Sequence, residues 1–177
     1  MAFQHILFEV TEEIATITLN RPEALNALSE AMREELDIVL PRIKEEANLA
    51  LACDFIFATP KSIFMQAFGR IGLVPDWSGF FLLPRFVGLQ KAKELVFTAR
   101  KVGAQEAKAL GMVYEIVPEA DLMGEVRAFA GRFRHASTTA IGIAKNILNQ
   151  SYNLDHRTLL ELEAFAQATC AGTDYHA

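Results

Sequence analysis

The hydrophobic pattern of the chain changes from alternation to helical spacing along its length. Residues 5–10 and 13–19 alternate apolar, often β-branched, side chains with polar ones, which predicts two strands around a polar turn. Apolar residues then follow a helical stripe over residues 30–46, after Ser29, which suits a helix N-cap. Further strands are predicted at 51–58, 62–66 and 112–117, and further helices at 77–86, 89–99, 104–110, 121–134, 137–150 and 155–171.

The order of these elements indicates the fold class. Strands and helices mix up to residue 118, where Pro118 follows the last predicted strand, whereas only helices are predicted afterwards. We therefore expect an α/β core over residues 1–118 and a helical C-terminal region over residues 119–177.

Composition and charge exclude several classes of protein. Of 177 residues, 51% are apolar and 22% charged, as in a globular protein that buries a core. The net charge of −5 comes without a basic block, which argues against a nucleic-acid surface. No apolar stretch is long enough to span a bilayer, and the N-terminus lacks the pattern of a signal peptide. We expect no nucleic-acid or membrane partner.

Cysteine and histidine usage points to a reducing compartment without a metal site. Cys53 and Cys170 lie far apart, and Cys53 falls in a predicted apolar strand, so we expect a buried thiol there. A cytoplasmic protein fits this usage better than a secreted disulfide scaffold. The histidines are scattered and no metal-ligand spacing occurs, so no metal is predicted.

One carboxylate, Asp76, lies within the apolar and aromatic run of residues 64–88. A carboxylate in apolar surroundings is costly to ionise, so we expect its pKa to rise toward neutral, as a general acid/base requires. Pro75 before it and Ser78 after it indicate a turn that leads into a helix. The alternative is that Asp76 only caps this helix, and the local sequence alone favours the cap.

Four segments, in order, resemble the enoyl-CoA hydratase/isomerase (crotonase) superfamily. They are Asn-Arg-Pro-Glu-Ala-Leu-Asn-Ala-Leu at 20–28, Leu-Ala-Leu-Ala-Cys-Asp-Phe-Ile-Phe-Ala at 49–58, the run at 64–88, and Gly-Ala-Gln-Glu-Ala-Lys-Ala-Leu-Gly-Met-Val at 103–113. The resemblance implies a crotonase-like (ClpP/crotonase) ββα superhelix core with a C-terminal helical trimerisation region. It also implies a homotrimer or hexamer that acts on an acyl-CoA thioester in fatty-acid metabolism.

The pattern is interrupted between Asn48 and Leu49, where a predicted helix runs into a predicted strand without a connection. Family members carry several dozen more residues here, which supply central strands and two loops that form the oxyanion hole. Their Gly-Gly-Gly motif is absent from this sequence. Either the protein is shortened or the sequence lacks a segment that the protein has. We favour the second, because deleting central strands would expose unpaired edges and an apolar core face.

The resemblance also indicates which chemistry the chain retains. Two-carboxylate hydratases of the superfamily use paired glutamates; the first would precede Leu49, where Asn48 stands, and the second aligns with Phe68, which cannot transfer a proton. Asp76 instead matches the aspartate in the Gly-Leu-Val-Pro-Asp motif of a ring-epoxide and enoyl-CoA isomerase branch. A single carboxylate suffices to move a double bond, if it reaches both carbons.

We therefore expect an enoyl-CoA isomerase in which Asp76 shuttles the proton and an oxyanion hole stabilises the enolate. Enoyl-CoA hydratase (a lyase) and a non-catalytic crotonase-like subunit that binds acyl-CoA remain alternatives. No cofactor is expected beyond the coenzyme A of the substrate. The resemblance assigns CoA binding to the backbone of Ala24, Leu25 and Ala27. The acyl pocket is expected from Phe68, Trp77, Phe80 and Phe81, whose other possible role is core packing.

Overall fold

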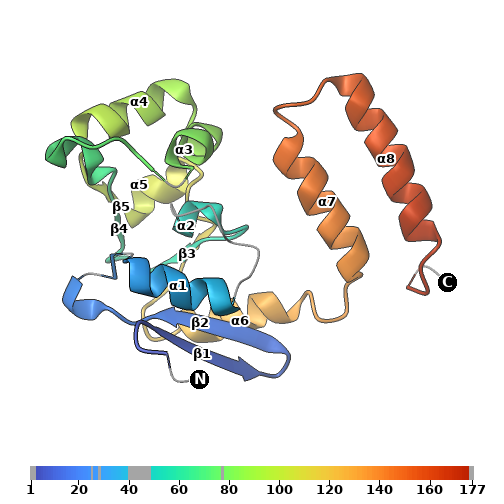
Figure 1. Ribbon diagram of the computed structural model, residues 1–177, viewed down its shortest axis with the longest axis horizontal. Helices are drawn as coiled ribbons and strands as arrows, with labels where there is room; N and C mark the ends of the chain where they lie inside the picture. The colour runs from blue at the N-terminus through green and yellow to red at the C-terminus, as the bar shows by residue number, and fades with distance from the viewer. Residues whose placement is uncertain (1–2, 25, 28, 40–48, 77, 176–177) are drawn as a thin grey trace. The chain divides into compact units, whose positions relative to one another are not determined.

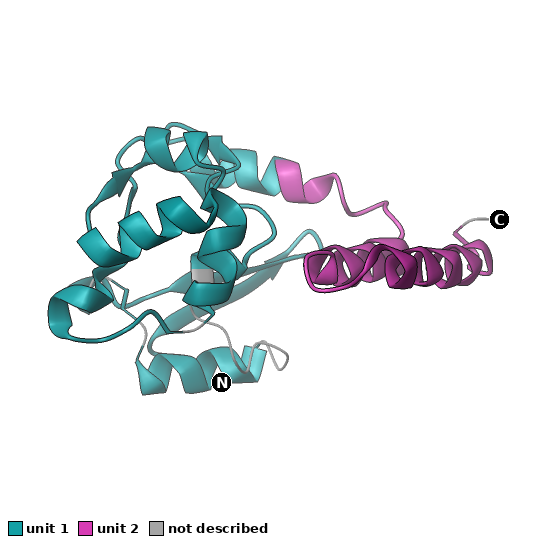
Figure 2. Cartoon of the chain, turned by 90° about the horizontal axis from the view of Figure 1, so that it is seen from above, with its two compact units in different colours: residues 1–128 teal, residues 129–177 magenta. Residues whose placement is uncertain are grey.

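The computed structural model of the chain describes residues 3–24, 26, 27, 29–39, 49–76 and 78–175 (Figure 1). The chain forms two compact units, residues 1–128 and 129–177, which Figure 2 colours separately. The division predicted from the sequence, at residue 118, stays a prediction. Among the described residues, no helix has both the length and the apolar character that crossing a membrane requires.

The first unit opens with the predicted hairpin. Strands β1 (Ile6–Thr11) and β2 (Ile14–Leu19) pair in antiparallel register, with Ile6 opposite Leu19 and Thr11 opposite Ile14. The two turn residues, Glu12 and Glu13, have φ values of 51° and 64°. Positive φ at both central residues is the geometry of a type I′ turn, whose twist matches that of the flanking strands.

Helix α1 (Glu30–Val39) completes a small core with this hairpin, in which Ile6, Met32 and Leu36 are buried. The Glu35 carboxylate of α1 accepts hydrogen bonds from the backbone N–H groups of Gln4, His5 and Ile6, at 2.8, 2.8 and 3.0 Å. Burial acts to raise the pKa of Glu35, but these hydrogen bonds outweigh it and the pKa is lowered. The predicted extension of this helix to residue 46 lies outside the described residues.

The rest of the first unit forms a larger core. Leu83, Leu95, Val102 and Ala107 are buried in it. Strands β3 and β6 pair in parallel and strands β4 and β5 pair antiparallel, so each sheet in the described part of the chain has two strands. The elements of this region are η1 (Pro22–Ala24), α2 (Leu49–Ala52), β3 (Phe57–Ala58), β4 (Ile63–Phe64), η2 (Ala67–Ile71), α3 (Gly79–Val87), α4 (Leu89–Thr98), β5 (Val102–Gly103), α5 (Ala104–Ala109) and β6 (Glu115–Ile116).

The strand predicted over residues 51–58 is wrong in its first half. Residues 49–52 form the short helix α2, and only Phe57 and Ala58 form a strand. The Leu-Ala-Leu-Ala sequence has high helix propensity, and an isolated strand gains little without neighbours to pair with. Because the chain turns here, Cys53 is exposed rather than buried as expected.

Three helices close the chain: α6 (Leu122–Gly131), α7 (Thr138–Gln150) and α8 (His156–Ala171). Ser137 caps α7 by accepting a hydrogen bond at its Oγ from the Ala140 N–H, at 3.2 Å. Asp155 caps α8 in the same way through the Thr158 N–H, at 3.1 Å. No described residue after Val117 is buried.

Candidate functional site

Asp76 lies in the connection between η2 and α3. The carbonyl of Phe68 accepts a hydrogen bond from the Leu73 N–H at 3.0 Å, and the carbonyl of Asp76 accepts one from the Gly79 N–H at 3.0 Å. The residue at the N-cap position of α3 is Ser78, which has a φ of 63°. The helix begins at Gly79, three residues after Asp76, and Asp76 does not occupy the cap position that the alternative interpretation requires.

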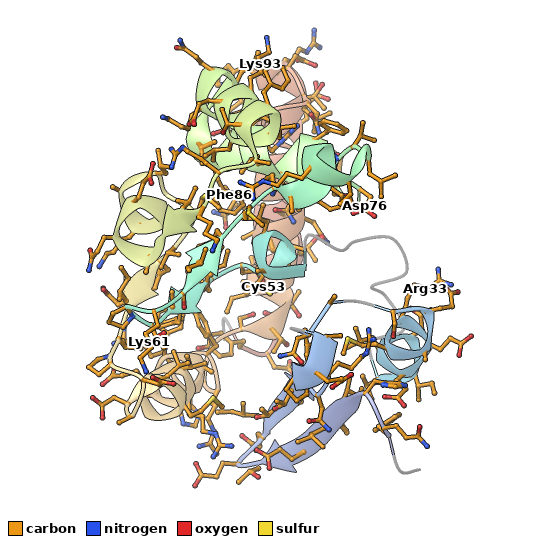
Figure 3. The ribbon with its side chains drawn as sticks, turned by 90° about the vertical axis from the view of Figure 1, so that its left-hand side faces the viewer. Arg33, Cys53, Lys61, Asp76, Phe86 and Lys93 are labelled. Carbon is orange, nitrogen blue, oxygen red and sulfur yellow. The ribbon has the colours of Figure 1, made fainter. Side chains whose placement is uncertain are left out.

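The surroundings of Asp76 differ from those expected. Asp76 is exposed, so the predicted burial among apolar side chains is wrong (Figure 3). Val74 and Phe80 are also exposed, at 68% and 59%, as is Leu73. Along the chain, Asp76 thus lies between exposed apolar residues. We call Leu73, Val74, Asp76 and Phe80 the Asp76 surface. Apolar groups gathered beside one carboxylate are typical of a surface that a ligand covers.

Arg85, one turn further along α3, contacts the side chain and the carbonyl of Phe81. The Arg85 guanidinium carbon lies 3.4 Å from the centre of the Phe81 ring, and Nη1 donates a hydrogen bond to the Phe81 carbonyl at 2.7 Å. Such a cation–π contact fixes the orientation of the ring. We did not predict this pair, although its i, i+4 spacing on an expected helix was a usable signal. Trp77, also predicted in the acyl pocket, lies outside the described residues.

Phe68 belongs to η2, the one-turn element that precedes the Asp76 connection. Its side chain is partly buried, and its carbonyl closes the turn by accepting hydrogen bonds from the N–H groups of Gly72 and Leu73. Gly72 has a φ of 73°, a conformation that favours glycine. The turn therefore fixes where the connection to Asp76 begins.

The segment predicted to bind CoA forms a closed turn in its described residues. The Asn26 side chain accepts a hydrogen bond from the Arg21 N–H at 2.7 Å, and Arg21 Nη1 donates to the Ala27 carbonyl at 2.6 Å. The Ala27 N–H also bonds to the Ala24 carbonyl at 2.9 Å. Arg21 is thus the cation that holds the turn. Leu25 lies outside the described residues.

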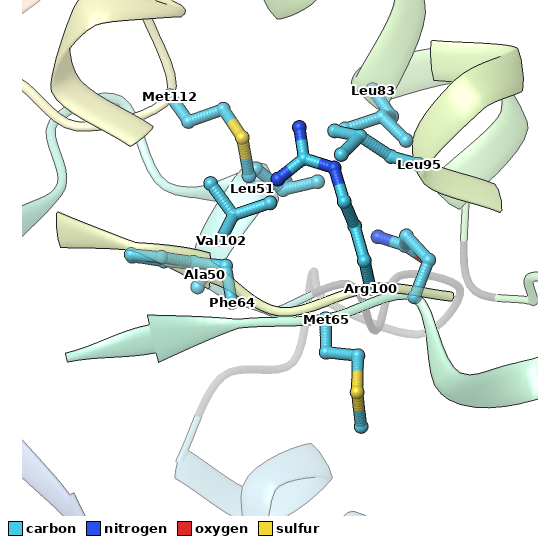
Figure 4. A pocket seen from close by; sticks show the side chains of 10 residues that line it. Ala50, Leu51, Phe64, Met65, Leu83, Leu95, Arg100, Val102 and Met112 are labelled. Carbon is cyan, nitrogen blue, oxygen red and sulfur yellow. The ribbon is translucent and has the colours of Figure 1, made fainter. Parts of the chain in front are cut away.

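A cavity of about 230 Å³ lies within the larger core (Figure 4). We call it the α2 cavity, because Ala50 and Leu51 of α2 line it. The predicted site residues that the structure describes do not line it, so this cavity and the Asp76 surface are separate features. Other residues of its wall are Phe64, Leu83, Leu95, Val102 and Met112.

Arg100 extends along the wall of this cavity (Figure 4). Two glutamates bind its guanidinium. Nε and Nη2 donate to the Glu94 carboxylate at 2.6 and 3.1 Å, and Nη1 and Nη2 donate to the Glu106 carboxylate at 2.9 and 2.6 Å. Nη1 also donates to the Lys101 carbonyl at 3.3 Å. These five hydrogen bonds use all five N–H donors of an arginine, so Arg100 has none left for an anionic ligand.

The ion pairs of Arg100 also change the acidity of its partners. Hydrogen bonds from Arg100 lower the pKa of Glu94 from its usual 4.5 to about 2, against an opposing effect of burial. Hydrogen bonds from Arg100 lower the pKa of Glu106 as well, and hydrogen bonds to the two glutamates raise the pKa of Arg100. Sequence reasoning missed this cluster, because its members come from three different elements or connections. In the described part of the chain, no three His, Cys, Asp or Glu side chains form a group that could hold a metal ion.

Comparison with known proteins identifies the relatives of the chain. The model of the enoyl-CoA hydratase/isomerase family matches residues 47–174. A probable enoyl-CoA hydratase of Rhodobacter capsulatus is 30% identical, with 94% of this chain and 90% of the relative covered. A trans-2-decenoyl-[acyl-carrier-protein] isomerase of Streptococcus mutans is 26% identical, with 98% and 92% covered.

A crystal structure of an enoyl-CoA hydratase/isomerase from Cupriavidus metallidurans CH34 superposes with a TM-score of 0.91, at 27% identity. The superposition covers 98% of this chain and 90% of the Cupriavidus chain. The predicted crotonase-like α/β fold is confirmed by this match.

The alignments also cross a stretch that this chain lacks. The alignment with the Rhodobacter protein spans 230 positions, although this chain has 177 residues. The relative therefore carries residues with no counterpart here. The family model begins to match at residue 47, next to the interruption predicted between Asn48 and Leu49. Asn48 itself lies outside the described residues.

Proposed function

Because the chain belongs to the enoyl-CoA hydratase/isomerase family, we propose that it is an enoyl-CoA isomerase in which Asp76 is the single proton shuttle. Family membership makes it an acyl-CoA enzyme. One observation carries the isomerase proposal: Asp76 is the only acidic residue between Asp54 and Glu94, and it lies exposed beside apolar side chains.

A single carboxylate can complete this reaction. Asp76 removes a proton from C2 of a 3-enoyl-CoA, and the electrons of the C–H bond delocalise into the thioester as an enolate. The same carboxyl group returns the proton to C4, and the double bond moves from the 3,4 to the 2,3 position. No water is consumed and no second acid/base is needed. The enolate oxygen requires hydrogen-bond donors in place before the proton moves.

The Asp76 surface supports this role through its apolar members. An acyl chain lying against Leu73, Val74 and Phe80 would remove their exposed surface from water. It would also exclude water from the carboxylate, which makes the carboxylate a stronger base in the bound state. Phe81, fixed by Arg85, would extend this apolar wall.

The turn around Ala24 and Ala27 supports a CoA-binding role. Arg21 and Asn26 hold this turn by hydrogen bonds that need no ligand. A backbone that is already ordered loses little conformational entropy when a ligand binds. In this proposal the CoA moiety binds here, and the acyl chain binds at the Asp76 surface.

Hydration of a 2-enoyl-CoA is the second candidate, favoured by the name of the Rhodobacter relative, a probable enoyl-CoA hydratase. The Streptococcus relative is named as an isomerase. Hydration by the paired-carboxylate scheme needs two acid/base groups, one that orients and deprotonates water and one that protonates C2. The family resemblance assigns the second group to position 68, where Phe68 cannot transfer a proton.

The Asp76→Asn variant tests the proposal. It keeps the shape of the side chain but cannot take up a proton. Isomerisation of a 3-enoyl-CoA should fall by about 10²- to 10⁴-fold, the usual share of general acid–base catalysis. CoA binding should change little, because the CoA contacts lie elsewhere. Asp174→Asn, in the C-terminal unit, is the matched control and should keep the rate of the wild type.

Two outcomes would contradict the proposal. A folded Asp76→Asn protein with full isomerase activity would remove Asp76 from the mechanism. A wild-type protein that hydrates 2-enoyl-CoA but does not isomerise 3-enoyl-CoA would make the chain a hydratase.

A further inference from the structure

We propose that Arg85 is a positioning residue that holds the Phe81 ring ready for the acyl group of the substrate. The inference rests on the proposed function, in which the acyl group binds beside Asp76, and it assigns Arg85 a measurable task within that function. Arg85 sets the affinity for the acyl group and takes no part in the proton transfer itself.

Arg85 contacts both the side chain and the backbone of Phe81. Its guanidinium carbon lies 3.4 Å from the centre of the ring, and its Nη1 donates to the Phe81 carbonyl at 2.7 Å. A cation over the face of a ring favours this one orientation of the ring. The hydrogen bond fixes the backbone from which the ring extends. One side chain therefore restrains Phe81 at two points.

The local sequence shows what this restraint adds to α3. The helix contains Pro84, which has no N–H to donate to the carbonyl of Phe80, the acceptor four residues earlier. The backbone ladder is therefore interrupted in the middle of a nine-residue helix. At the start of α3, Ser78 has a φ of 63° and makes no capping hydrogen bond with its side chain. The hydrogen bond from Arg85 to Phe81 lies next to the interruption and joins two successive turns.

Phe81 is also accessible to a ligand. It remains 42% exposed although Arg85 lies over its ring. The Asp76 carbonyl accepts a hydrogen bond from the Gly79 N–H at 3.0 Å, and the Ser78 carbonyl accepts one from the Phe81 N–H at 2.9 Å. Two hydrogen-bonded turns of backbone thus lead from the proposed base to the ring.

The position of the cation is specific along the chain. Arg85 is the only charged residue between Asp76 and Lys91, in a segment that is otherwise mostly apolar. Its side chain is partly buried. A cation that only keeps a helix in water would be exposed, whereas this one lies over an aromatic ring.

A ring that is already held binds an acyl group at a smaller cost in entropy. Ordering one mobile side chain at an interface lowers affinity by about 2- to 10-fold. Arg85 should therefore contribute a factor of this size to the binding of the acyl group. It should contribute nothing to the binding of CoA without an acyl group, because the CoA moiety binds at the turn around Ala24 and Ala27 in the proposed function.

The test compares the affinities of the full chain for decanoyl-CoA and for CoA by calorimetry. Decanoyl-CoA has no double bond to move, so the result does not depend on catalysis. Arg85→Met removes the charge and the donor, and should weaken decanoyl-CoA about 2- to 10-fold while CoA binds as before. Arg85→Lys keeps a cation near the ring and should recover part of the loss. Lys93→Met removes a charge from an exposed position on α4, and should bind both ligands like the wild type.

A double-mutant cycle shows whether Arg85 acts through the ring. Phe81→Leu removes the ring and keeps an apolar side chain. In this background Arg85→Met should no longer weaken decanoyl-CoA, because no ring remains to be held. Should Arg85→Met fail to fold, Arg85→Lys takes its place in the cycle, and should lose its effect in the Phe81→Leu background.

Kinetics separate positioning from catalysis. With 3-decenoyl-CoA as substrate, Arg85→Met should raise KM and leave kcat and its pH profile unchanged, because binding is weakened equally in the ground state and the transition state. A variant that only loosened the fold would lower kcat and the melting temperature together.

Three results would overturn the proposal. Equal affinities of the wild type and Arg85→Met for decanoyl-CoA would leave Arg85 without a role in binding. Equal weakening of decanoyl-CoA and CoA would make Arg85 a contact of CoA or a purely structural residue. Additive effects in the cycle would show that Arg85 does not act through Phe81. A wild type with the expected binding pattern but no isomerase activity would support the role of Arg85 and contradict only the isomerase assignment.

Discussion

The two compact units use their apolar residues in different ways. The first unit buries Leu83, Val102 and Ile6 almost completely, in two cores of its own. The described helices of the second unit bury no residue, although α7 and α8 carry apolar side chains along much of their length. Phe165, for example, is 73% exposed. The first unit thus buries apolar side chains in its own cores, whereas the described helices of the second unit leave theirs partly or largely exposed.

An apolar groove runs between α7 and α8. It has a volume of about 490 Å³ and is lined by Ile143, Ile147 and Leu148, among others. Helices of this length gain most of their stability from packing of an apolar face, and exposed apolar patches mark interaction surfaces. This supports, as a proposal, the homotrimer or hexamer expected from the family resemblance.

The largest effect should come from a charge on this exposed helical surface. We expect the wild type to form a trimer or hexamer at micromolar concentration, and Phe165→Glu to lower its mass to that of the 19.6 kDa chain, because an unpaired charge cannot be buried at an interface. Light scattering gives the mass, and circular dichroism checks that the helices persist. Glu161→Gln, an exposed change on the same helix, is the control. A monomeric wild type would show that the second unit does not use its exposed apolar surface for assembly.

Truncating a buried side chain of the first unit should lower the free energy of unfolding more than truncating an exposed side chain of the second. Leu83 is 1% exposed, so Leu83→Ala should lower the free energy of unfolding by about 2–5 kcal/mol. Leu160→Ala, at an exposed position on α8, should change the stability of a dissociated chain by about 0.5 kcal/mol or less. Urea unfolding measures both. Equal losses in the two variants would mean that α8 is buried to the same degree as the core.

The cap of α7 should have a smaller effect. Ser137→Ala removes the acceptor of the Ala140 N–H and should cost about 1 kcal/mol. Thr139→Ala, an exposed change within the first turn of the same helix, serves as the control. Loss of helix signal on warming reports the difference. An unchanged Ser137→Ala protein would show that contacts elsewhere, rather than the cap, hold this end of α7.

The acid dependence of the first unit should be the smallest effect. Glu94 has a pKa of about 2 in the folded protein, against 4.5 ordinarily. Its ion pair therefore stabilises the fold fully above about pH 4.5, and this contribution is lost as the pH falls from 4.5 toward 2. Glu94→Gln should flatten the decline in unfolding free energy across this range, whereas Glu125→Gln on α6 should not. Parallel declines in the wild type and Glu94→Gln would exclude Arg100 as the cause.

The local elements were predictable because their information lies within a few residues. Alternation predicted both strands of the N-terminal hairpin, and Ser29 marked the start of a helix. The segment at 49–58 was not predictable in this way. Its apolar residues suit a strand only when neighbouring strands are present. In their absence, helix propensity decides the conformation at Leu51, which is helical.

The position of the site stays a prediction from the sequence, and its environment was not predictable. The sequence places Asp76 among apolar neighbours along the chain, but whether those neighbours bury it depends on what packs over them. In the structure Val74 and Phe80 are exposed, and so is the carboxylate. The Arg100 cluster was hidden for a related reason, because its carboxylates come from α4 and α5, which meet only after folding.

The Glu35 carboxylate bears on the order in which the chain folds during synthesis. The N–H groups of Gln4, His5 and Ile6 leave the ribosome before their acceptor, which follows about thirty residues later. A two-stranded hairpin alone is marginally stable in water. The segment at residues 4–6 can therefore be fixed only after α1 has emerged, and until then it remains accessible to chaperones.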